Sequence, residues 1–465
     1  MAAGFDLFEC ISPLDYRYYG RNRELKKALG AFLSENAKVS YQARVEEEFV
    51  KTLARKKACP RSVALEVSKA VKKIKPLEVY REEDRIKHDV RALVNRIKAR
   101  VSNESKRYVH LGLTSYDVVD TANMLRYRDA AEKVIIPYLK RLEKALIRVA
   151  MRERATVQIG RTHGQFASPV TFGFAMAEYV ERLGERILAV EKAKDSLAGK
   201  LSGGVGASNA LSLVCGNPEE LEKETLKRLG LKTARHSTQI VPREAQLDLV
   251  HALVSAFGVI ANLADDLRHL QRSEIAEVYE AFGKKQVGSS TMPQKHNPIT
   301  FENVKSLWKE FMPRAFTLYL DQISEHQRDL SNSASSRFIP EIFAALAYSA
   351  DRMASAVERL KVDRRKMREN FALAENTVAA EPLYVLLALK GCLDAHEKVR
   401  KLSLQAERSG KPLLQIAFKN RALRDYFSEF SKKELSLLEN PQNYTGTAEA
   451  RTEKVCRHWK KALKL

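Results

Sequence analysis

The feature that most constrains the fold is a long helical run between Gln246 and Arg272, QLDLVHALVSAFGVIANLADDLRHLQR. One broad apolar stripe repeats along it at helical spacing, and Leu249, Leu253 and Val259 lie outside that stripe. A helix that is apolar on most sides must be covered on most sides. We therefore expect this segment inside a helix bundle that other subunits can help to complete.

Other segments show the same periodicity. Long runs start at Val134 and Phe172, and further runs start near Thr300, Ile339 and Ala379. Gly and Pro, the residues that most often interrupt helices, number only 20 and 14 among 465 residues. No strand-rich block or internal repeat is evident in the sequence. The pattern therefore predicts an all-α fold.

The helical runs differ in length along the chain, and this difference predicts three helical domains. Residues 1–110 carry short, charged runs that would form an N-terminal domain. Residues 111–364 carry the long runs and would form a central bundle, with an irregular loop at 284–299. Residues 365–465 return to shorter runs, which predict a C-terminal helical domain.

Local signals mark where helices begin and end. Pro60 and Pro76 interrupt the N-terminal runs, because proline is not tolerated inside a helix. Asn217 and Gly230 are expected to cap the two ends of one helix. Ser431 is expected to begin another helix through a capping box with the glutamate three residues later.

Composition limits the compartment and the kind of site. Five cysteines occur without any C-x-x-C pair, so the sequence suggests neither a disulfide framework nor a thiolate metal site. The N-terminal stretch lacks the basic start and continuous apolar core of a signal peptide. No charge-free apolar run reaches about 18 residues, the length of a membrane span. We expect a soluble, cytoplasmic protein with no membrane partner.

The chain is strongly basic. Lys and Arg number 80 against 58 Asp and Glu, which gives a formal net charge of +22 and favours an anionic partner, either nucleic acid or a small polyanion. Basic clusters at 55–61, 69–75 and 363–368 have no interleaved aromatic residues that would stack on bases. We interpret them as solvated helix faces and do not expect nucleic acid as a partner. A basic helical scaffold that binds nucleic acid is the alternative from another functional class.

Polar loop segments supply the candidates for chemistry. GRTHGQ, residues 160–165, places His163 among polar residues just before the long run at Phe172, where loop residues are often functional. A structural or solvated histidine is the alternative. His88, in KHDV, falls on an expected helix, and its role is open in the same way.

A second segment, HLGLTSYDVVDTA, begins at His110 and contains Thr114, Ser115 and Asp117. These hydroxyl and carboxylate groups can cap the helix that follows. A helix N-terminus lined with hydroxyl groups also binds carboxylates and phosphates well. The sequence is compatible with both uses.

A third segment, QRDLSNSASSR at residues 327–337, presents Arg328 and Arg337 around a group of serines that includes Ser333. Guanidinium forks and serine hydroxyls suit a phosphate dianion. A serine-rich linker with surface arginines is the alternative.

A fourth segment, GSSTMPQKHNP at residues 288–298, separates two helical runs. It provides mobility through glycine, exposed hydroxyls through Ser289 and Ser290, and a cation through Lys295. Composition alone favours a flexible linker over a catalytic loop.

Taken together, these segments resemble the fumarase, aspartase and argininosuccinate lyase superfamily, whose signature is close to GSSxMPxKxNP. All the fixed positions of that signature are present in GSSTMPQKHNP. The adenylosuccinate lyases are the most similar group, because SPLDYRY, HLGLTSYDVVDTA, GRTHGQFASP and QRDLSNSASSR resemble their LDGRY, HxGLTSxDVVDTA, GRTHGQPATP and RDxSxSxxxR elements. The resemblance extends in order over about residues 11–340.

The resemblance implies a β-elimination that releases fumarate. A base removes a proton next to a carboxylate, and an acid protonates the departing nitrogen. By the match, Ser289 is the general base, His163 is the general acid, and Glu302 is the carboxylate that orients His163. Lys295 would lower the cost of forming the serine alkoxide and the anionic intermediate. His88 matches a family histidine near the nucleotide, with a less settled role.

The same match assigns the substrate contacts. The residues that correspond to positions holding the succinyl carboxylates are Thr114, Ser115, Thr162, Gln239, Ser290 and Asn297. The residues that correspond to the nucleotide phosphate site are Arg17, Tyr18, Arg328, Ser333 and Arg337. His110 corresponds to a second family histidine near the nucleotide, and its role is also open.

The chain departs from the family pattern at several loop positions. Tyr16 stands where LDGRY has glycine, and Tyr116 replaces a small residue. Phe166 replaces the proline after HGQ, and His296 replaces the common Arg or Val. None of these changes removes a proposed catalytic group, so we expect differences in loop shape more than in reaction type.

The resemblance also implies an assembly and a substrate class. Three-domain helical subunits would form a homotetramer whose active sites are each built from three subunits. The implied substrates are succinyl nucleotides, namely adenylosuccinate and SAICAR, the succinocarboxamide ribotide of purine synthesis, and no metal or organic cofactor is implied. The alternative enzyme is another fumarate-releasing lyase, such as argininosuccinate lyase, whose substrate has no phosphate and would not need arginines at both chain ends.

Overall fold

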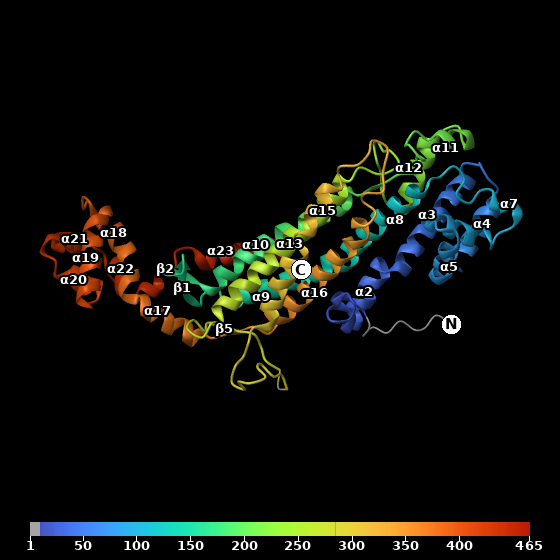
Figure 1. Ribbon diagram of the computed structural model, residues 1–465. Helices are drawn as coiled ribbons and strands as arrows, with labels where there is room; N and C mark the ends of the chain where they lie inside the picture. Colours follow the sequence, from blue (N-terminus) through green and yellow to red (C-terminus); the bar gives the residue numbers. More distant parts are fainter. Residues whose placement is uncertain (1–9, 284) are drawn as a thin grey trace. The chain divides into compact units, whose positions relative to one another are not determined.

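The computed structural model describes residues 10–283 and 285–465, and these residues are mostly helical (Figure 1). Contacts between Cα atoms divide the chain into two units, each assembled from separate stretches of sequence. Unit 1 comprises the chain up to Leu139, Glu185–Ile260 and Ser306–Asp351. Unit 2 comprises Lys140–Gly184, Ala261–Lys305 and Arg352–Leu465. The division at residues 110 and 364 into three domains stays a prediction.

Unit 1 is helical apart from one short strand pair. Its N-terminal elements are α1 (Pro13–Tyr16), η2 (Tyr19–Arg21), α2 (Arg23–Leu33), α3 (Glu35–Arg55), α4 (Arg61–Val71), α5 (Pro76–Ile86), α6 (Asp89–Lys98) and α7 (Asn103–Lys106). Its further elements are α8 (Ser115–Ala130), the π-helical η3 (Ala131–Ile135), β3 (Ala198–Gly199), α11 (Asn209–Val214), α12 (Pro218–Leu229), β4 (Lys232–Thr233) and α15 (Arg314–Leu320). α3 packs against α4 and α8 (Figure 1), and α5 packs against α6.

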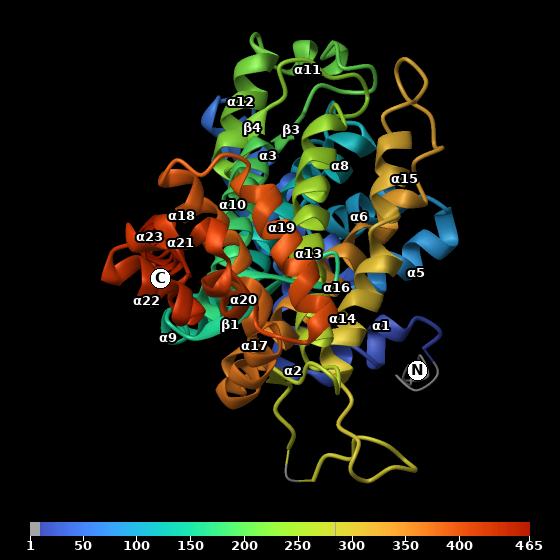
Figure 2. The same cartoon turned by 90° about the vertical axis from the view of Figure 1, so that its left-hand side faces the viewer.

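Unit 2 contains two antiparallel strand pairs and the C-terminal helices. Its elements are β1 (Val157–Thr162), β2 (Gln165–Thr171), β5 (Val278–Tyr279), β6 (Lys361–Val362), α17 (Arg364–Val378), α18 (Ala380–Leu389), α19 (Ala395–Ser409), α20 (Leu413–Lys419), η4 (Arg421–Leu423), α21 (Arg424–Ser428), α22 (Lys432–Glu439), η5 (Pro441–Asn443) and α23 (Ala448–Ala462). Helices α18 to α22 gather around one apolar cluster that includes Leu383, Leu413 and Leu438 (Figure 2). The long helices that contribute residues to both units are α9 (Ile136–Arg152), α10 (Phe172–Ser196), α13 (Glu244–Leu270), α14 (Ile299–Phe311) and α16 (Ser335–Glu358).

The helix boundaries confirm the capping signals of the sequence. Pro60 lies at the N-cap of α4, and Pro76 is the first residue of α5. The Asn217 side chain accepts a hydrogen bond from the backbone of α12, and Gly230 ends that helix with a φ of 78°. Ser431 begins α22 in a capping box. These predictions of helix ends are correct because each capping interaction depends on only a few neighbouring residues.

Helix α13 is buried on most sides, as its sequence predicts, and one polar face that includes Asp248, His251 and Asn262 is exposed. Leu249, Leu253 and Val259, which lie outside the main apolar stripe, are only 1%, 0% and 8% exposed. By length and composition alone, α13 and the stretch Arg364–Leu389 are apolar enough to cross a bilayer. The most apolar window of α13 is 67% buried, as in the core helix of a globular protein.

The hairpin β1–β2 departs from the expectation of helices alone. It occupies the segment immediately before α10, in which the sequence suggested only a polar loop. Val157, Ile159 and Val170 supply β-branched side chains to the two strands. Such strands are too short for periodicity to distinguish them from a loop or a helix end.

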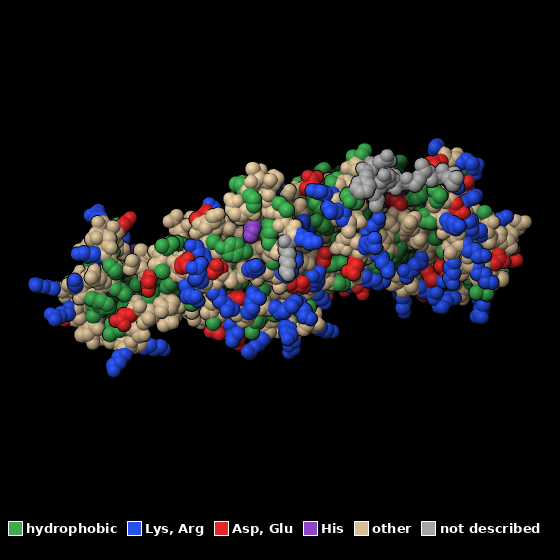
Figure 3. Space-filling model, turned by 90° about the horizontal axis from the view of Figure 1, so that it is seen from below, with side chains coloured by type: hydrophobic (Ala, Val, Ile, Leu, Met, Phe, Trp, Pro, Cys, Tyr) green, Lys and Arg blue, Asp and Glu red, His purple; other side chains and the backbone are tan. Residues whose placement is uncertain are grey.

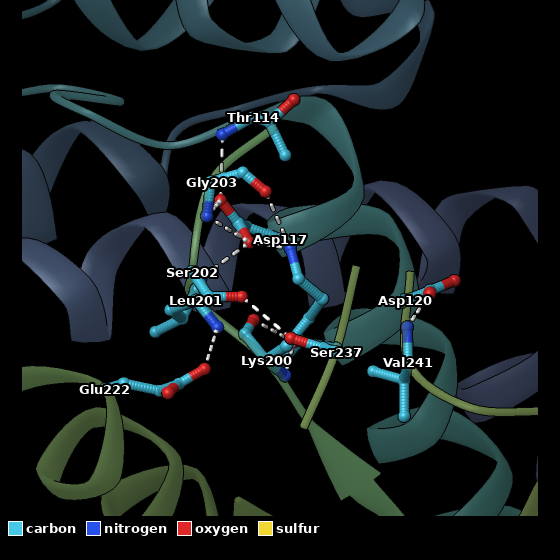
Figure 4. A network of polar contacts seen from close by, with 11 residues as sticks. Thr114, Asp117, Asp120, Lys200, Leu201, Ser202, Gly203, Glu222, Ser237 and Val241 are labelled. Carbon is cyan, nitrogen blue, oxygen red and sulfur yellow. Dashed lines mark hydrogen bonds and ion pairs between the residues drawn. The ribbon is translucent and has the colours of Figure 1, made fainter. Parts of the chain in front are cut away.

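A buried ion pair fixes the start of α8 in unit 1. The Lys200 ammonium donates to the Asp117 carboxylate and to the Gly203 carbonyl, and both charged side chains are 0% exposed (Figure 4). Asp117 also accepts from the backbone N–H groups of Thr114, at 2.8 Å, and Ser202, at 3.0 Å. The pair therefore ties the first turn of α8 to the loop that follows β3.

The same loop is held by further polar contacts. The Leu201 N–H donates to Glu222 at 2.6 Å, and the Ser202 and Ser237 hydroxyls lie 2.8 Å apart (Figure 4). Gly206 has a φ of 84°, and a Cβ there would lie 2.0 Å from the Ser237 carbonyl oxygen. Glycine is required at this position by both its conformation and the close backbone contact.

A buried acid without a hydrogen-bond partner lies in unit 2. Among the described residues, neither carboxylate oxygen of Glu143 on α9 has a hydrogen-bond partner, and the residue is 0% exposed. Burial, with a contribution from nearby Glu181, raises the pKa of Glu143 to about 9. Glu181 itself accepts from the Trp459 indole at 2.7 Å. Glu143 is therefore protonated in the folded protein at neutral pH.

We predict that Asp117→Asn costs more stability than Lys200→Met. The first change leaves the buried Lys200 ammonium without its counter-charge, a loss of about 3–5 kcal/mol. The second leaves Asp117 with its backbone donors, which continue to stabilise the carboxylate. Denaturant unfolding of both variants and of the double variant measures this difference. Equal losses for the two single changes would contradict the asymmetry.

We predict that Glu143→Gln removes a pH-dependent loss of stability. The folded-state pKa of about 9 lies above the ordinary value of 4.5, so the unfolded state releases its proton first as pH rises. Wild-type stability should fall by about 1.4 kcal/mol per pH unit within that window because of this group. The melting temperature of Glu143→Gln relative to wild type should therefore rise between pH 5 and pH 9. A constant offset across that range would show that Glu143 does not titrate as described.

Candidate active site

A polar cavity of about 470 Å³ in unit 1 collects several of the residues expected to bind substrate. The predicted residues that line it are His88, Ser115, Gln239, Ser333 and Arg337. They come from the N-cap of α6, from α8 and α16, and from loops between helices, and lie far apart in the sequence. The structure thus brings together part of both the predicted carboxylate site and the predicted phosphate site.

Two helix N-termini border this cavity. Ser115 is the first residue of α8, and Ser336 and Arg337 lie in the first turn of α16. The N-terminus of a long helix carries free N–H groups and a partial positive charge. Two such ends at one cavity favour an anionic ligand.

The charged side chains of the cavity add to this positive potential. The cations that line it are Lys38, Lys87, Arg126 and Arg337, and the carboxylates are Glu35, Glu83 and Asp89. Lys38 pairs with Glu35 at 3.4 Å, and Arg126 donates to backbone carbonyls of the α2 end. Among the described residues, Lys87 and Arg337 have no ion-pair partner. Two cations therefore remain available for a ligand.

The two N-terminal histidines have different surroundings. His88 is the N-cap of α6, where its Nδ1 accepts from the Arg91 N–H at 3.3 Å, and its side chain is 52% exposed. His110 has a φ of 63°, and its Nδ1 lies 2.5 Å from a carboxylate oxygen of the fully buried Glu46. Burial opposes protonation of His110, but the charge and hydrogen bond of Glu46 outweigh it and raise the pKa of His110.

Arg328 lies beside the main cavity and contacts an aromatic side chain. Its guanidinium carbon is 3.4 Å from the centre of the Tyr116 ring, and its Nη2 donates to the Tyr116 hydroxyl. Arg328 lines a smaller cavity of about 30 Å³, and Tyr116 lines both cavities. Tyr116 is one of the positions at which the chain departs from the family pattern.

Arg17 and Tyr18 do not line the cavity, although the sequence placed them with the phosphate site. Arg17 is exposed at the end of α1, and the Tyr18 ring contacts Tyr348 edge-on at 5.2 Å. Tyr16, which replaces a family glycine, lies within α1 in helical conformation. Any L-residue adopts that conformation, so this substitution imposes no strain on the turn.

In unit 2, His163 lies at the tip of the hairpin β1–β2. Thr162 pairs with Gln165, and the two residues between them, His163 and Gly164, have φ angles of 54° and 76°. Positive φ at both central residues is the pattern of a two-residue type I′ hairpin turn. The turn exposes the imidazole and the Thr162 side chain to solvent.

A buried carboxylate that the sequence analysis overlooked anchors this hairpin. Glu277 is 0% exposed and accepts from Gln158 at 2.6 Å, from Arg161 at 2.7 Å and from Asn370 at 2.8 Å. Gln158 and Arg161 belong to β1, close to the His163 turn. Glu277 thus holds the strand that carries the predicted general acid. In the sequence, Glu277 is only an acidic residue just before a short apolar stretch. Hydrophobic periodicity does not distinguish such a buried acid from an acid on the surface.

The signature segment forms an exposed loop between β5 and α14, which extends away from the helices of its own unit (Figures 1 and 2). The Ser289 Oγ accepts from the backbone N–H groups of Thr291, at 3.3 Å, and Met292, at 3.0 Å. Backbone donors aimed at one oxygen stabilise negative charge on it. The local fold of the loop is therefore suited to a serine that becomes an alkoxide.

Other contacts define the shape of the loop. The Asn297 side chain donates to the Gly288 carbonyl at 2.9 Å, which draws the two ends of the segment together. A Cβ at Gly288 would lie 2.1 Å from the Lys295 carbonyl oxygen, so only glycine fits this approach. His296, another departure from the family pattern, stacks on Phe282 at 4.4 Å between ring centres. Ser290 and Lys295 are exposed.

The single chain does not assemble the predicted acid–carboxylate pair. Glu302 is exposed in the first turn of α14, and no hydrogen bond joins it to His163 within the described part of the chain. The residues predicted to bind the nucleotide phosphate lie in unit 1. Unit 2 contains the other candidates of the hairpin, the signature loop and α14, namely Thr162, His163, Ser289, Ser290, Lys295, Asn297 and Glu302.

Sequence comparison agrees with these motifs. A family model described as "Lyase" matches residues 21–310, and one described as "Adenylosuccinate lyase C-terminal" matches residues 324–445. An adenylosuccinate lyase of Pyrococcus horikoshii is 35% identical over 451 residues, covering 96% of this chain and 97% of that protein. An adenylosuccinate lyase of Archaeoglobus fulgidus is 33% identical over 458 residues, covering 98% of this chain and 100% of that protein.

Solved structures show the same fold. A fumarate lyase from Mesorhizobium sp. BNC1 superposes with a TM-score of 0.81 at 22% identity, over 92% of this chain and 97% of that chain. A 3-carboxy-cis,cis-muconate lactonizing enzyme from Pseudomonas putida superposes with a TM-score of 0.83 at 22% identity, over 98% of this chain and 100% of that chain. With the family models and the nearly full-length relatives, the chain belongs to the adenylosuccinate lyase family of carbon–nitrogen lyases.

Proposed function

We propose that the protein cleaves a carbon–nitrogen bond in two succinyl nucleotides of purine biosynthesis. Adenylosuccinate would give AMP and fumarate, and SAICAR would give its carboxamide, AICAR, and fumarate. Both reactions are β-eliminations: a proton leaves one carbon of the succinyl group, a C=C bond forms, and the C–N bond breaks. The departing nitrogen takes up a proton.

The observation that carries this proposal is the polar cavity of about 470 Å³ in unit 1. It combines the N-termini of α8 and α16 with the unpaired cations Lys87 and Arg337. A nucleotide phosphate is a dianion that suits such a cavity. Argininosuccinate has no phosphate, so this cavity favours a succinyl nucleotide over the substrate of the alternative lyase.

Ser289 acts as the general base in the proposed mechanism. An ordinary serine hydroxyl is far too weak a base near neutral pH, so its alkoxide needs strong stabilisation. The N–H groups of Thr291 and Met292 point at its Oγ, and Lys295 on the same loop supplies a positive charge. Closure of the loop over the substrate would exclude water and strengthen both effects.

His163 acts as the general acid and gives its proton to the departing nitrogen. Its hairpin tip is exposed and its strand is anchored by Glu277, so the imidazole is available to a bound substrate. Glu302 would orient and charge His163 in the complete site. The residues proposed to hold the succinyl carboxylates are Thr114, Ser115, Thr162, Gln239, Ser290 and Asn297.

The complete site would form in a homotetramer of three-domain subunits, with each active site shared between subunits. Supporting this assembly, a cavity of about 890 Å³ in unit 2 is lined mainly by apolar side chains, among them Phe166, Phe174 and Leu373. In unit 1, Leu320 and Ile323 are 68% and 78% exposed. Large apolar side chains left open in one chain are typical of surfaces that a partner covers.

The proposed partners are small molecules in the cytoplasm, not nucleic acid. Lys and Arg side chains are distributed over the face in Figure 3, with Asp and Glu between them. A nucleic-acid-binding protein more often concentrates its basic residues along one stripe or patch.

We predict that Ser289→Ala and His163→Ala each lower turnover of adenylosuccinate by about a hundredfold or more, because each removes a proton-transfer group. The absorbance change on fumarate release measures the rates, with argininosuccinate as a parallel substrate. The exposed residues Ser212 and His458 provide matched controls. Ser212→Ala and His458→Ala should keep wild-type rates.

Near-normal turnover by either site variant would remove that residue from the mechanism. If the wild-type protein cleaved argininosuccinate and not adenylosuccinate, the proposed substrate class would be wrong.

We predict a tetramer in light scattering at working concentration, with the mass of four 52.7 kDa chains. Mixing Ser289→Ala with His163→Ala subunits under exchange should restore part of the activity, because a shared site can then contain both wild-type residues. A monomer in light scattering, or no recovery after proven exchange, would contradict shared active sites.

A further inference from the structure

Tyr116 and Arg328 form a contact that the proposed reaction does not explain. The guanidinium lies over the Tyr116 ring, with 3.4 Å between its Cζ and the ring centre, and Nη2 donates to the phenol oxygen. The ring contact and the hydrogen bond together restrict the position and the rotation of the guanidinium. The two residues are separated by 212 positions in sequence, so the contact is a tertiary one.

The contact holds Arg328 without neutralising it. Among the described residues, no carboxylate forms an ion pair with Arg328, and the nearby Asp120 is already bonded to Arg243 and to the Val241 N–H. An aromatic ring attracts a cation through its quadrupole and leaves the full charge available. The remaining guanidinium N–H groups stay free to donate to an anion.

The Tyr116 hydroxyl keeps a proton of its own. Burial raises the pKa of Tyr116, and the opposing charge of Arg328 does not cancel that effect. The phenol is therefore neutral at pH 7, and while it accepts from Arg328 it can donate its own proton. Tyr116 lines the cavity that also contains Ser333 and Arg337.

We propose that Tyr116, which lines both cavities, is a positioning residue for Arg328, which it holds as a pre-oriented, un-neutralised cation in the wall of the smaller cavity, and that this contact selects ligands bearing a phosphate. The inference rests on the proposed function in that the phosphate belongs to the nucleotide substrate. Tyr116, Val119, Asn123 and Ser336 line both cavities, so the contact lies where the smaller cavity meets the larger one.

The test compares the binding of AMP and adenosine, which differ by the phosphate alone, to the full-length protein by calorimetry. Tyr116→Ser removes both the ring and the hydroxyl and should weaken AMP about tenfold. Tyr116→Phe keeps the ring and should weaken AMP by about threefold. Adenosine affinity should stay unchanged in both variants, because neither change removes a nucleoside contact.

A double-mutant cycle separates positioning from simple filling of space. In an Arg328→Met background, Tyr116→Ser should produce no further loss of AMP affinity, because its partner is already gone. Arg337→Met is the control, since Arg337 lines the larger cavity together with Tyr116 and, within the described part of the chain, no hydrogen bond or cation–π contact joins the two. In that background the effect of Tyr116→Ser should remain about tenfold. With adenylosuccinate, the loss in Tyr116→Phe should fall more on KM than on kcat.

Equal weakening of AMP and adenosine, or additive effects of Tyr116→Ser and Arg328→Met, would overturn the inference. Unchanged AMP affinity in the correctly folded Tyr116→Ser variant would do the same. The binding experiment does not need turnover. Suppose that the wild-type protein binds AMP more tightly than adenosine, that this difference depends on Tyr116, and that no succinyl nucleotide is cleaved. This result would contradict the proposed reaction and leave the inference on Tyr116 standing.

Discussion

The buried ion pair between Asp117 and Lys200 is the interaction on which the candidate site of unit 1 depends. Removing both charges from water costs several kcal/mol per ion, about as much as the net stability of many domains. The structure offsets this cost with backbone donors on Asp117 and the Gly203 carbonyl on Lys200. Because Ser115 follows directly after Thr114, the position of the cavity wall is determined by a pair that lines no part of the cavity.

Unit 2 uses the same physical solution at its hairpin. Glu277 is a buried charge that becomes tolerable because Gln158, Arg161 and Asn370 all donate to it. In return, the carboxylate joins β1 to α17 and limits the movement of the turn that carries His163. In each unit, a fully buried charged group supports a side chain proposed to contact substrate. Such support explains how flexible polar loops can hold defined positions.

Local signals in the sequence predicted the helices well, including the ends of α12 and the burial of α13 on most sides. They failed at the hairpin, because its turn is His-Gly and not the usual Asn-Gly, and its strands are too short for a periodicity test. They also missed Lys200, whose partner lies 83 residues away, and Glu277, whose partner Arg161 lies 116 residues away. Motif resemblance identified the groups proposed to carry chemistry, but not the buried charges that hold them.

The exposure of the catalytic candidates in a single chain has an energetic consequence. At about 4 Å, a lysine and an alkoxide attract each other by only about 1 kcal/mol in bulk water, but by about 4 kcal/mol at an effective dielectric constant of 20. Lys295, Glu302 and His163 are all exposed in the isolated chain. Water around them would leave the Ser289 alkoxide too costly to form near neutral pH. In the proposed mechanism, the surfaces that cover these residues therefore supply part of the catalytic power, so that subunit assembly and loop closure would be steps of the chemistry and not only sources of stability.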